Sequence, residues 1–194
     1  MSTFEAYLKL GWSHILDIEG YDHMLFLVAL LALYTMKSWK PVLILITAFT
    51  LGHSITLLIT GLKGPILPGE WVEFLIPVTI IITVAGNLLA ANQRKEPKGF
   101  SWRYALAGFF GLIHGMGFSN FFSELMGKDT DILMPLLAFN VGIELGQIAF
   151  VLALLIFQFL LIQIFRMQTR SWNLVLSGAA GGVAVLLLFE NYPF

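Results

Sequence analysis

Long apolar segments separated by short polar connectors constrain this chain more than any other feature. A helix that crosses the hydrocarbon core of a bilayer needs roughly 20 predominantly apolar residues, and most of the segments are about that long. They lie at residues 22–37, 41–60, 71–91, 102–123, 132–165 and 172–190. Together they predict an all-α, polytopic membrane helix bundle with six main transmembrane helices.

The composition agrees with a membrane protein and excludes other classes. Hydrophobic residues make up 58% of the chain and charged residues 12%, whereas soluble domains carry about 25% charged residues. The net charge of −1 argues against a nucleic-acid partner. Without cysteine there are neither disulfides nor thiolate metal ligands. We therefore expect one integral membrane domain over residues 1–194, surrounded by membrane lipid.

Two segments depart from the simple pattern. Residues 1–21 are only weakly amphipathic, which predicts either an outer interfacial helix or the first part of a broken span. The fifth apolar segment has 34 residues, about 51 Å of helix, and is expected to be tilted or to protrude from the membrane. No internal repeat is evident in the sequence.

The basic residues predict the orientation of the bundle. Eight of the lysines and arginines fall in the connectors after the first, third and fifth segments, and three fall on the opposite side. An excess of Lys and Arg marks the cytoplasmic side of a membrane protein. Both termini are therefore expected to face outward.

All four histidines lie in or beside apolar segments, where ionisable groups are costly and usually functional. His53 and His114 are each twelve residues from the inner start of their segment, about 18 Å of helix. Asp22 and His23 open the first segment from the outer side. We expect His23, His53 and His114 to bind one metal ion in the outer half, with Asp22 or His14 completing the shell. The alternative is separate histidines, each bonded to a neighbouring helix.

The types of ligand limit the choice of metal ion but do not identify it. Imidazole and carboxylate groups suit Zn, Ni, Co, Fe or Cu(II). The absence of cysteine argues against Cu(I) and iron–sulfur sites. Haem is less suited, because polar residues and glycines surround the histidines.

Further polar residues inside the apolar segments are expected to form the second shell or a permeation path. Asn140, Glu144 and Gln147 share one helix face, and Glu144 is a candidate proton carrier. A polar stripe over the second and third segments suits either a permeation path or helix packing, since Ser and Thr often bond to their own helix backbone. The stripe consists of Glu73, Thr79, Thr83 and Asn87 of the third segment, and the residues of the second segment expected to face it are Thr47, Thr50 and Ser54.

Four motifs, at residues 14–26, 49–57, 110–118 and 139–147, resemble in order the signatures of the HupE/UreJ family of nickel/cobalt permeases. The fourth motif is typical of its UreJ-like branch. The resemblance implies a bacterial inner-membrane protein of six to seven spans that handles a transition metal. The residues that it implicates are His14, Asp22, His23, His53, His114 and Glu144.

Two functions of different classes follow from these observations. The first is transport of a nickel/cobalt-type divalent cation, with Ni, Co and Zn all open as the metal. The second is an intramembrane metal-dependent hydrolase of a lipid-like amide or ester, with Glu144 or Asp22 as general base. A metal sensor or accessory subunit is a weaker third. A transporter needs polar continuity through the inner half, whereas a hydrolase needs a lateral opening and an open coordination position. A homo-oligomer is compatible with either function.

Overall fold

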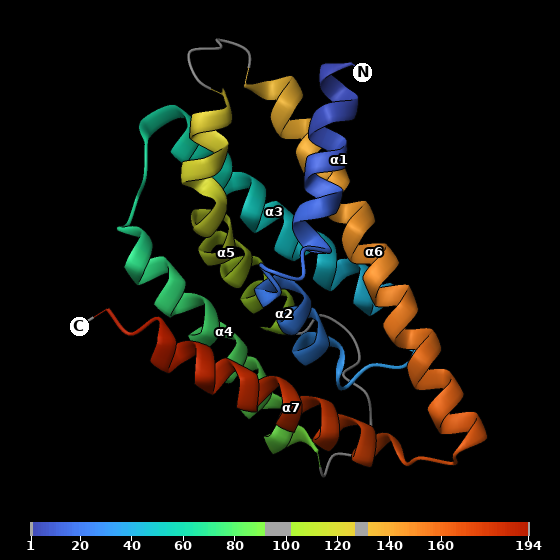
Figure 1. Cartoon of the computed structure of the whole chain (residues 1–194). Coiled ribbons are helices and arrows are strands. Elements are labelled where there is room, and N and C mark those ends of the chain that lie inside the picture. The colour runs from blue at the N-terminus through green and yellow to red at the C-terminus, as the bar shows by residue number, and fades with distance from the viewer. Residues whose placement is uncertain (1, 92–101, 127–131, 194) are drawn as a thin grey trace.

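The structure is a computed structural model that describes residues 2–91, 102–126 and 132–193. These residues form an all-helical bundle without strands (Figure 1), as predicted. The helices, in chain order, are α1 (Thr3–Ile15), α2 (Asp22–Leu31), the 3₁₀ turn η1 (Met36–Ser38), α3 (Trp39–Lys63), α4 (Gly69–Ala90), α5 (Trp102–Met126), α6 (Leu133–Ile164) and α7 (Thr169–Glu190).

Within the described residues, four helices are long and apolar enough to cross a membrane by themselves. They are α3 together with η1, α4, α6 and α7. The predicted count of six is not reached by this criterion. Helix α5 has sufficient length, but it carries Arg103, His114 and four glycines. Helix α2 ends at Leu31, before the expected boundary at residue 37, because the chain turns there into η1.

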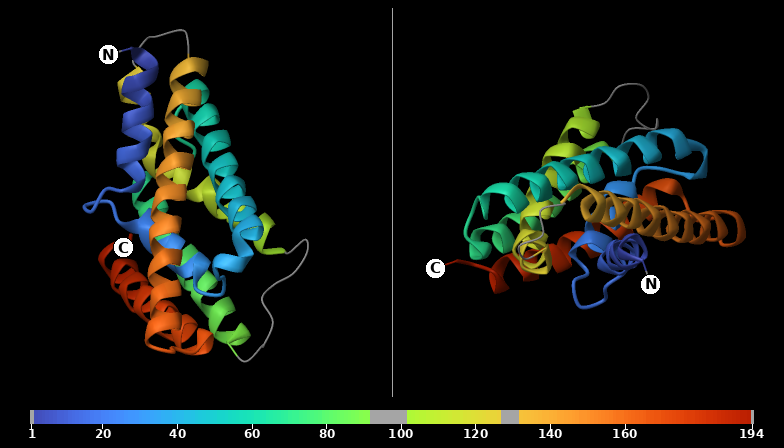
Figure 2. Two further views of the ribbon diagram at one scale, coloured as in Figure 1. Left: turned by 90° about the vertical axis from the view of Figure 1, so that its right-hand side faces the viewer. Right: turned by 90° about the horizontal axis from the view of Figure 1, so that it is seen from above.

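The segment before α2 consists of helix α1 and the loop that follows it. A capping box starts α1: the Ser2 hydroxyl accepts from the Glu5 amide at 3.2 Å, and the Ser2 amide donates to the Glu5 carboxylate at 2.9 Å. The chain leaves the helix at Leu16 and turns through a loop before α2 begins. Both Figure 1 and Figure 2 show α1 alongside the first part of α6.

Two pairs of parallel helices, α1·α6 and α3·α5, pack with their backbones in direct contact. A Cβ atom at Gly11 would overlap the carbonyl oxygen of Phe139, and one at Gly142 would overlap that of Leu8. In the other pair, Gly111 faces the carbonyl oxygen of Phe49 in the same way. Glycine is required at these positions because any side chain would push the helices apart.

The contacts of the two pairs correspond residue by residue. Gly52 faces the carbonyl of Gly108 and the amide nitrogen of Leu112, as Gly142 faces those of Leu8 and Trp12. Equivalent residues of α1 and α5 are 100 positions apart in the sequence (8 and 108, 12 and 112). Equivalent residues of α3 and α6 are 90 positions apart (52 and 142). The pairs run in opposite directions along the bundle (Figure 1). The described residues therefore contain an inverted repeat of two helix pairs, which the sequence did not make evident.

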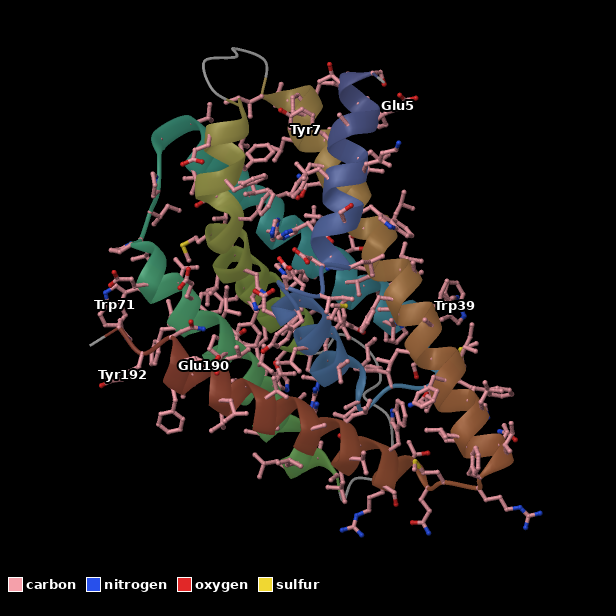
Figure 3. The ribbon with its side chains drawn as sticks, in the orientation of Figure 1. Glu5, Tyr7, Trp39, Trp71, Glu190 and Tyr192 are labelled. Carbon is pink, nitrogen blue, oxygen red and sulfur yellow. The ribbon has the colours of Figure 1, made fainter. Side chains whose placement is uncertain are left out.

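The remaining helices complete the bundle and its apolar surface. Helices α4 and α7 pack against each other, and α2 contacts both of them. Figure 3 shows Trp71 and Tyr192 together at one edge of the molecule, at the start of α4 and just after α7, and Trp39 on the opposite side, at the start of α3. All three have exposed side chains. Aromatic residues at such positions are typical of the two membrane–water interfaces.

Candidate metal centre

Four helices bring all four histidines into one cluster. His14 lies at the end of α1, His23 at the start of α2, His53 in the middle of α3 and His114 in α5. The ring centroid of His23 is 4.6 Å from that of His14, 5.7 Å from that of His53 and 5.1 Å from that of His114. His23 is thus the centre of the cluster, because the break between α1 and α2 turns the first residues of α2 toward the other helices.

Asp22 orients the ring of His23. Its Oδ1 accepts from the backbone amide of His23 at 2.9 Å and from His23 Nδ1 at 3.0 Å. A carboxylate can only accept here, so the proton of the neutral ring is on Nδ1 and the lone pair is on Nε2. Metal-binding histidines are commonly held by a carboxylate in this way. The pair leaves Nε2, which is buried and has no hydrogen-bond partner, available as a ligand.

Thr79 orients the ring of His114 in a similar way. The single hydroxyl proton of Thr79 is donated to the carbonyl oxygen of Ile76 at 2.7 Å. At the 3.1 Å contact with His114 Nε2, Thr79 must therefore accept, and the ring must donate. This places the proton on Nε2 and leaves His114 Nδ1, which has no partner, with a free lone pair.

The ligand atoms fall into two overlapping groups that could hold a metal ion. One group is His14, His23 and His53, and the other is Asp22, His23 and His114. In each group the atoms lie within 4.8 Å of one another. The sequence grouped His114 with His23 and His53 around one ion, whereas the structure places His14 in that three-histidine group. Both ring nitrogens of His53 and Nε2 of His14 are buried and have no hydrogen-bond partner.

Aromatic rings that the sequence analysis did not single out enclose the cluster. Phe118 and Phe139 stack with a centroid distance of 4.8 Å and an interplanar angle of 6°, and Phe118 lies 4.2 Å from the ring of His14. Phe26 and Phe49 flank His114, each at 5.1 Å. Three of these rings stand one helical turn from a histidine in the sequence (26 and 23, 49 and 53, 118 and 114). That spacing was the signal that could have identified them.

An open hollow reaches the cluster beside α1. Its lining includes His14, the α1–α2 loop with Asp17 and Glu19, and Phe118 and Phe121 of α5. Asp17 and Glu19 are exposed, and Asp17 Oδ1 accepts from the Glu19 amide at 3.0 Å, which shapes the loop. The lining of the hollow at His14 thus combines two carboxylates with apolar side chains.

The predicted polar face of α6 does not join the histidines. Asn140 donates to the carbonyl of Leu136 in its own helix. Glu144 and Gln147 meet Thr47 and Thr50 of α3 in a separate cluster. Their helix face turns toward α3 one turn away from His53.

Most residues of the predicted polar stripe do not contact the histidines. Ser54 and Thr83 each donate to a carbonyl four residues earlier in their own helix, and Glu73 is exposed near the start of α4. Thr79 alone of this stripe contacts a histidine.

Asn87 belongs to a second polar network, at the far end of α2. It donates to the carbonyl of Ala29 at 2.6 Å and accepts from Arg103 at 3.1 Å, while Asn173 of α7 donates to its backbone carbonyl at 3.1 Å. This network joins α2, α4, α5 and α7. It does not reach the histidines, because Asn87 is more than two helical turns from Thr79.

The fold and the cluster together define a polytopic membrane protein with a buried group of imidazoles suited to a metal ion. The sequence pattern of the family described as "HupE / UreJ protein" matches residues 1–192, and the chain belongs to this family. The family is generally one of membrane metal transporters, for nickel or cobalt. No curated protein and no solved structure gives a match.

Proposed function

We propose that this protein carries a divalent transition metal ion of the nickel/cobalt type across the bacterial inner membrane, and that its histidine cluster binds the ion in transit. The observation that carries the proposal is the convergence of unpartnered ring nitrogens from α1, α2 and α3. Buried polar atoms in proteins are normally hydrogen-bonded. Those of His14, His23 and His53 are instead buried without partners and face one another.

In this proposal His14, His23 and His53 donate the nitrogen ligands. Asp22 fixes the tautomer of His23 and supplies negative charge beside the ion. His114, held by Thr79, forms with Asp22 and His23 the adjacent position to which the ion can pass by ligand exchange. Family membership and the imidazole donors support Ni or Co, while the same donors also suit Zn.

The proposed topology has six passages, of which the first is made by α1 and α2 together. Both termini face the outside, as the excess of Lys and Arg on the other side supports. The ion enters past Asp17 and Glu19 and reaches His14 through the hollow. The loop of residues 16–21 is compatible with membrane depth because it lines this hollow, where water can satisfy its backbone.

The lining of the hollow also supports one alternative to metal transport. Leu10, Leu16 and Phe121 line it together with His14, and such a lining suits an acyl chain. A metal-dependent hydrolase of a lipid-like amide or ester is therefore the second candidate. In that case a metal-bound water would be the nucleophile and Asp22 its base.

The test is metal analysis of the purified protein by mass spectrometry, combined with uptake into proteoliposomes. The protein should retain Ni²⁺ or Co²⁺ and accumulate it, and His53→Ala should lose both properties. Gln163→Ala, which changes an exposed side chain of α6, is the control and should keep them. Equal metal content in the protein and in His53→Ala would contradict the proposal. Release of a fatty acid from a fluorescent lipid amide, without uptake, would favour the hydrolase.

A further inference from the structure

A groove between α4 and α5 shares no residue with the histidine cluster or with the hollow at His14. Two exposed side chains, Ile82 of α4 and Trp102 of α5, belong to its lining. The buried members of the lining are mostly apolar, namely Leu30, Thr83, Ala107 and Phe110. The groove therefore has a buried apolar floor and opens to the surface of the bundle.

One end of the groove is polar and the rest is apolar. Arg103 is the second residue of α5, and its Nη2 would be 4.0 Å from a Cβ atom at Gly86 of α4. Phe110 lies seven residues further along α5, about 10 Å of helix. A charge at the end of a membrane helix, followed by an apolar channel into the bilayer, matches the order of headgroup and acyl chain in a lipid.

Two neutral side chains position the guanidinium of Arg103. Its Nη1 donates to Asn87 Oδ1 at 3.1 Å, and its central carbon is 5.7 Å from the ring centroid of Trp102. Asn87 is itself fixed, because it is buried and its Nδ2 donates to the carbonyl of Ala29 at 2.6 Å. The amide thus orients Arg103 without neutralising its charge. It engages one of the five N–H donors of the guanidinium, and two suffice to bind a phosphate group.

The side of the bundle that holds Arg103 has an excess of positive charge. In the proposed topology α3, α5 and α7 begin at this side of the membrane, and α4 and α6 end there. The described residues at this side, 32–41, 88–91, 102–104 and 163–171, include no acidic residue. Their basic residues are Lys37, Lys40, Arg103, Arg166 and Arg170. Such a cluster attracts an anionic headgroup, whereas it repels the ammonium group of a zwitterionic one.

We propose that the groove between α4 and α5 is a binding site for an anionic phospholipid. Arg103 binds the phosphate, and the indole of Trp102 lies at the level of the headgroup, as is typical of tryptophan at a membrane interface. One acyl chain follows the groove past Gly86 toward Phe110. Gly86 leaves room for the chain beside the guanidinium because it has no side chain. The site does not depend on the proposed transport function.

Native mass spectrometry of the full-length protein in detergent tests the site. Phosphatidylglycerol should bind about 10-fold more tightly than phosphatidylcholine with the same acyl chains, and Arg103→Gln should remove this difference, the size expected for one charge-assisted contact. Arg170→Gln, which changes an exposed cation on the same side, should alter binding by less than about 2-fold. Equal binding of the two lipids, or an equal loss in both variants, would overturn the proposal.

A second variant tests the groove and retains the guanidinium. A Cβ atom at Gly86 has only the 4.0 Å contact with Arg103, so Gly86→Leu should fold and place its side chain in the path of the acyl chain. Binding of phosphatidylglycerol should weaken about 10-fold, the effect of excluding about two methylene groups. Ala85→Leu adds the same side chain at an exposed position outside the lining and should leave binding unchanged. If Arg103→Gln fails to fold, this pair of variants decides, and unaltered binding in Gly86→Leu would overturn the proposal.

Inorganic phosphate distinguishes a lipid site from a site for a free anion. A ligand that binds only the folded protein raises its unfolding temperature. Phosphatidylglycerol should therefore raise the unfolding temperature followed by circular dichroism, and it should do so less in Gly86→Leu. Inorganic phosphate at the same concentration should have no such effect. An equal rise with inorganic phosphate, or none with phosphatidylglycerol, would overturn the proposal.

Discussion

The helix pairs α1·α6 and α3·α5 share one backbone design and differ in what they present at its centre. Gly11 and Gly142 bring the first pair together as Gly111 and Gly52 bring the second. Yet α5 continues past His114 to Met126, whereas α1 stops at Ile15, directly after His14. The same backbone contacts thus support a long continuous helix, α5, in one pair and a short helix, α1, in the other.

The residues at equivalent positions differ as well. His53 and Ser54 of α3 correspond to Ile143 and Glu144 of α6. The imidazole of His53 belongs to the histidine cluster, and the carboxyl group of Glu144 accepts hydrogen bonds from Thr47 and Thr50 of α3. The symmetry therefore fixes the scaffold, while substitutions within it separate a nitrogen-rich site from an oxygen-rich one.

The comparison is tested first at the glycines. Gly52→Ala and Gly142→Ala would each place a methyl group on a carbonyl oxygen of the partner helix. We expect each to destabilise the protein by about 3 kcal/mol, the upper part of the range for overpacking, in unfolding followed by circular dichroism. Gly178→Ala meets open space and should have little effect. A cost in only one pair would show that the repeat is not structurally equivalent.

The equivalent histidines His14 and His114 provide the second test. If the ion occupies the group of His14, His23 and His53, loss of His14 removes a ligand and loss of His114 removes only a neighbour. We expect His14→Ala to weaken Ni²⁺ or Co²⁺ binding roughly 100-fold and His114→Ala roughly 10-fold, measured by calorimetry. The opposite order would assign the ion to Asp22, His23 and His114.

The contact between Thr79 and His114 provides a third test. It is found in one helix pair only, because among the described residues His14 of α1 has no equivalent threonine contact. Thr79→Val removes the acceptor of His114 Nε2–H and frees the tautomer. Metal affinity should fall by up to about 10-fold, and Thr79→Ser should restore it. Nitrogen NMR should show His114 with its proton on Nε2 in the unaltered protein and a mixture in Thr79→Val. An unchanged tautomer in that variant would remove Thr79 from the site.

The smallest effect is expected at the loop that interrupts α1. Asp17→Asn together with Glu19→Gln should slow metal uptake at low ionic strength by about 2- to 3-fold, because the carboxylates raise the local concentration of cations. The difference should disappear at about 1 M salt, where charges are screened within roughly 3 Å. Slower uptake that is independent of salt would mean that the loop acts through its shape.

The helical class and the membrane setting could be read from the sequence. Apolar length and low charge alone predict membrane helices, because the backbone in lipid must satisfy its own hydrogen bonds. Counting residues from Pro41 and Trp102 also placed His53 and His114 at one level, since a helix rises by a constant amount per residue. The four rings lie close together in the structure, and their common depth in the membrane stays a prediction.

Other features were decided only by the tertiary structure. The inverted repeat is carried by backbone contacts at a few glycines, so that few side chains need to match and the sequence shows little of it. Asn87 was expected in a polar stripe of the third segment and Glu144 in the second shell of the metal or as a proton carrier, yet the crossing of helices places the first against Ala29 and the second against Thr50. A sequence gives height along a helix and the face on which a residue lies. Which faces meet depends on the rotation of each helix against its neighbours. This rotation is set by packing among segments that are distant in the sequence, so only the tertiary structure determines it.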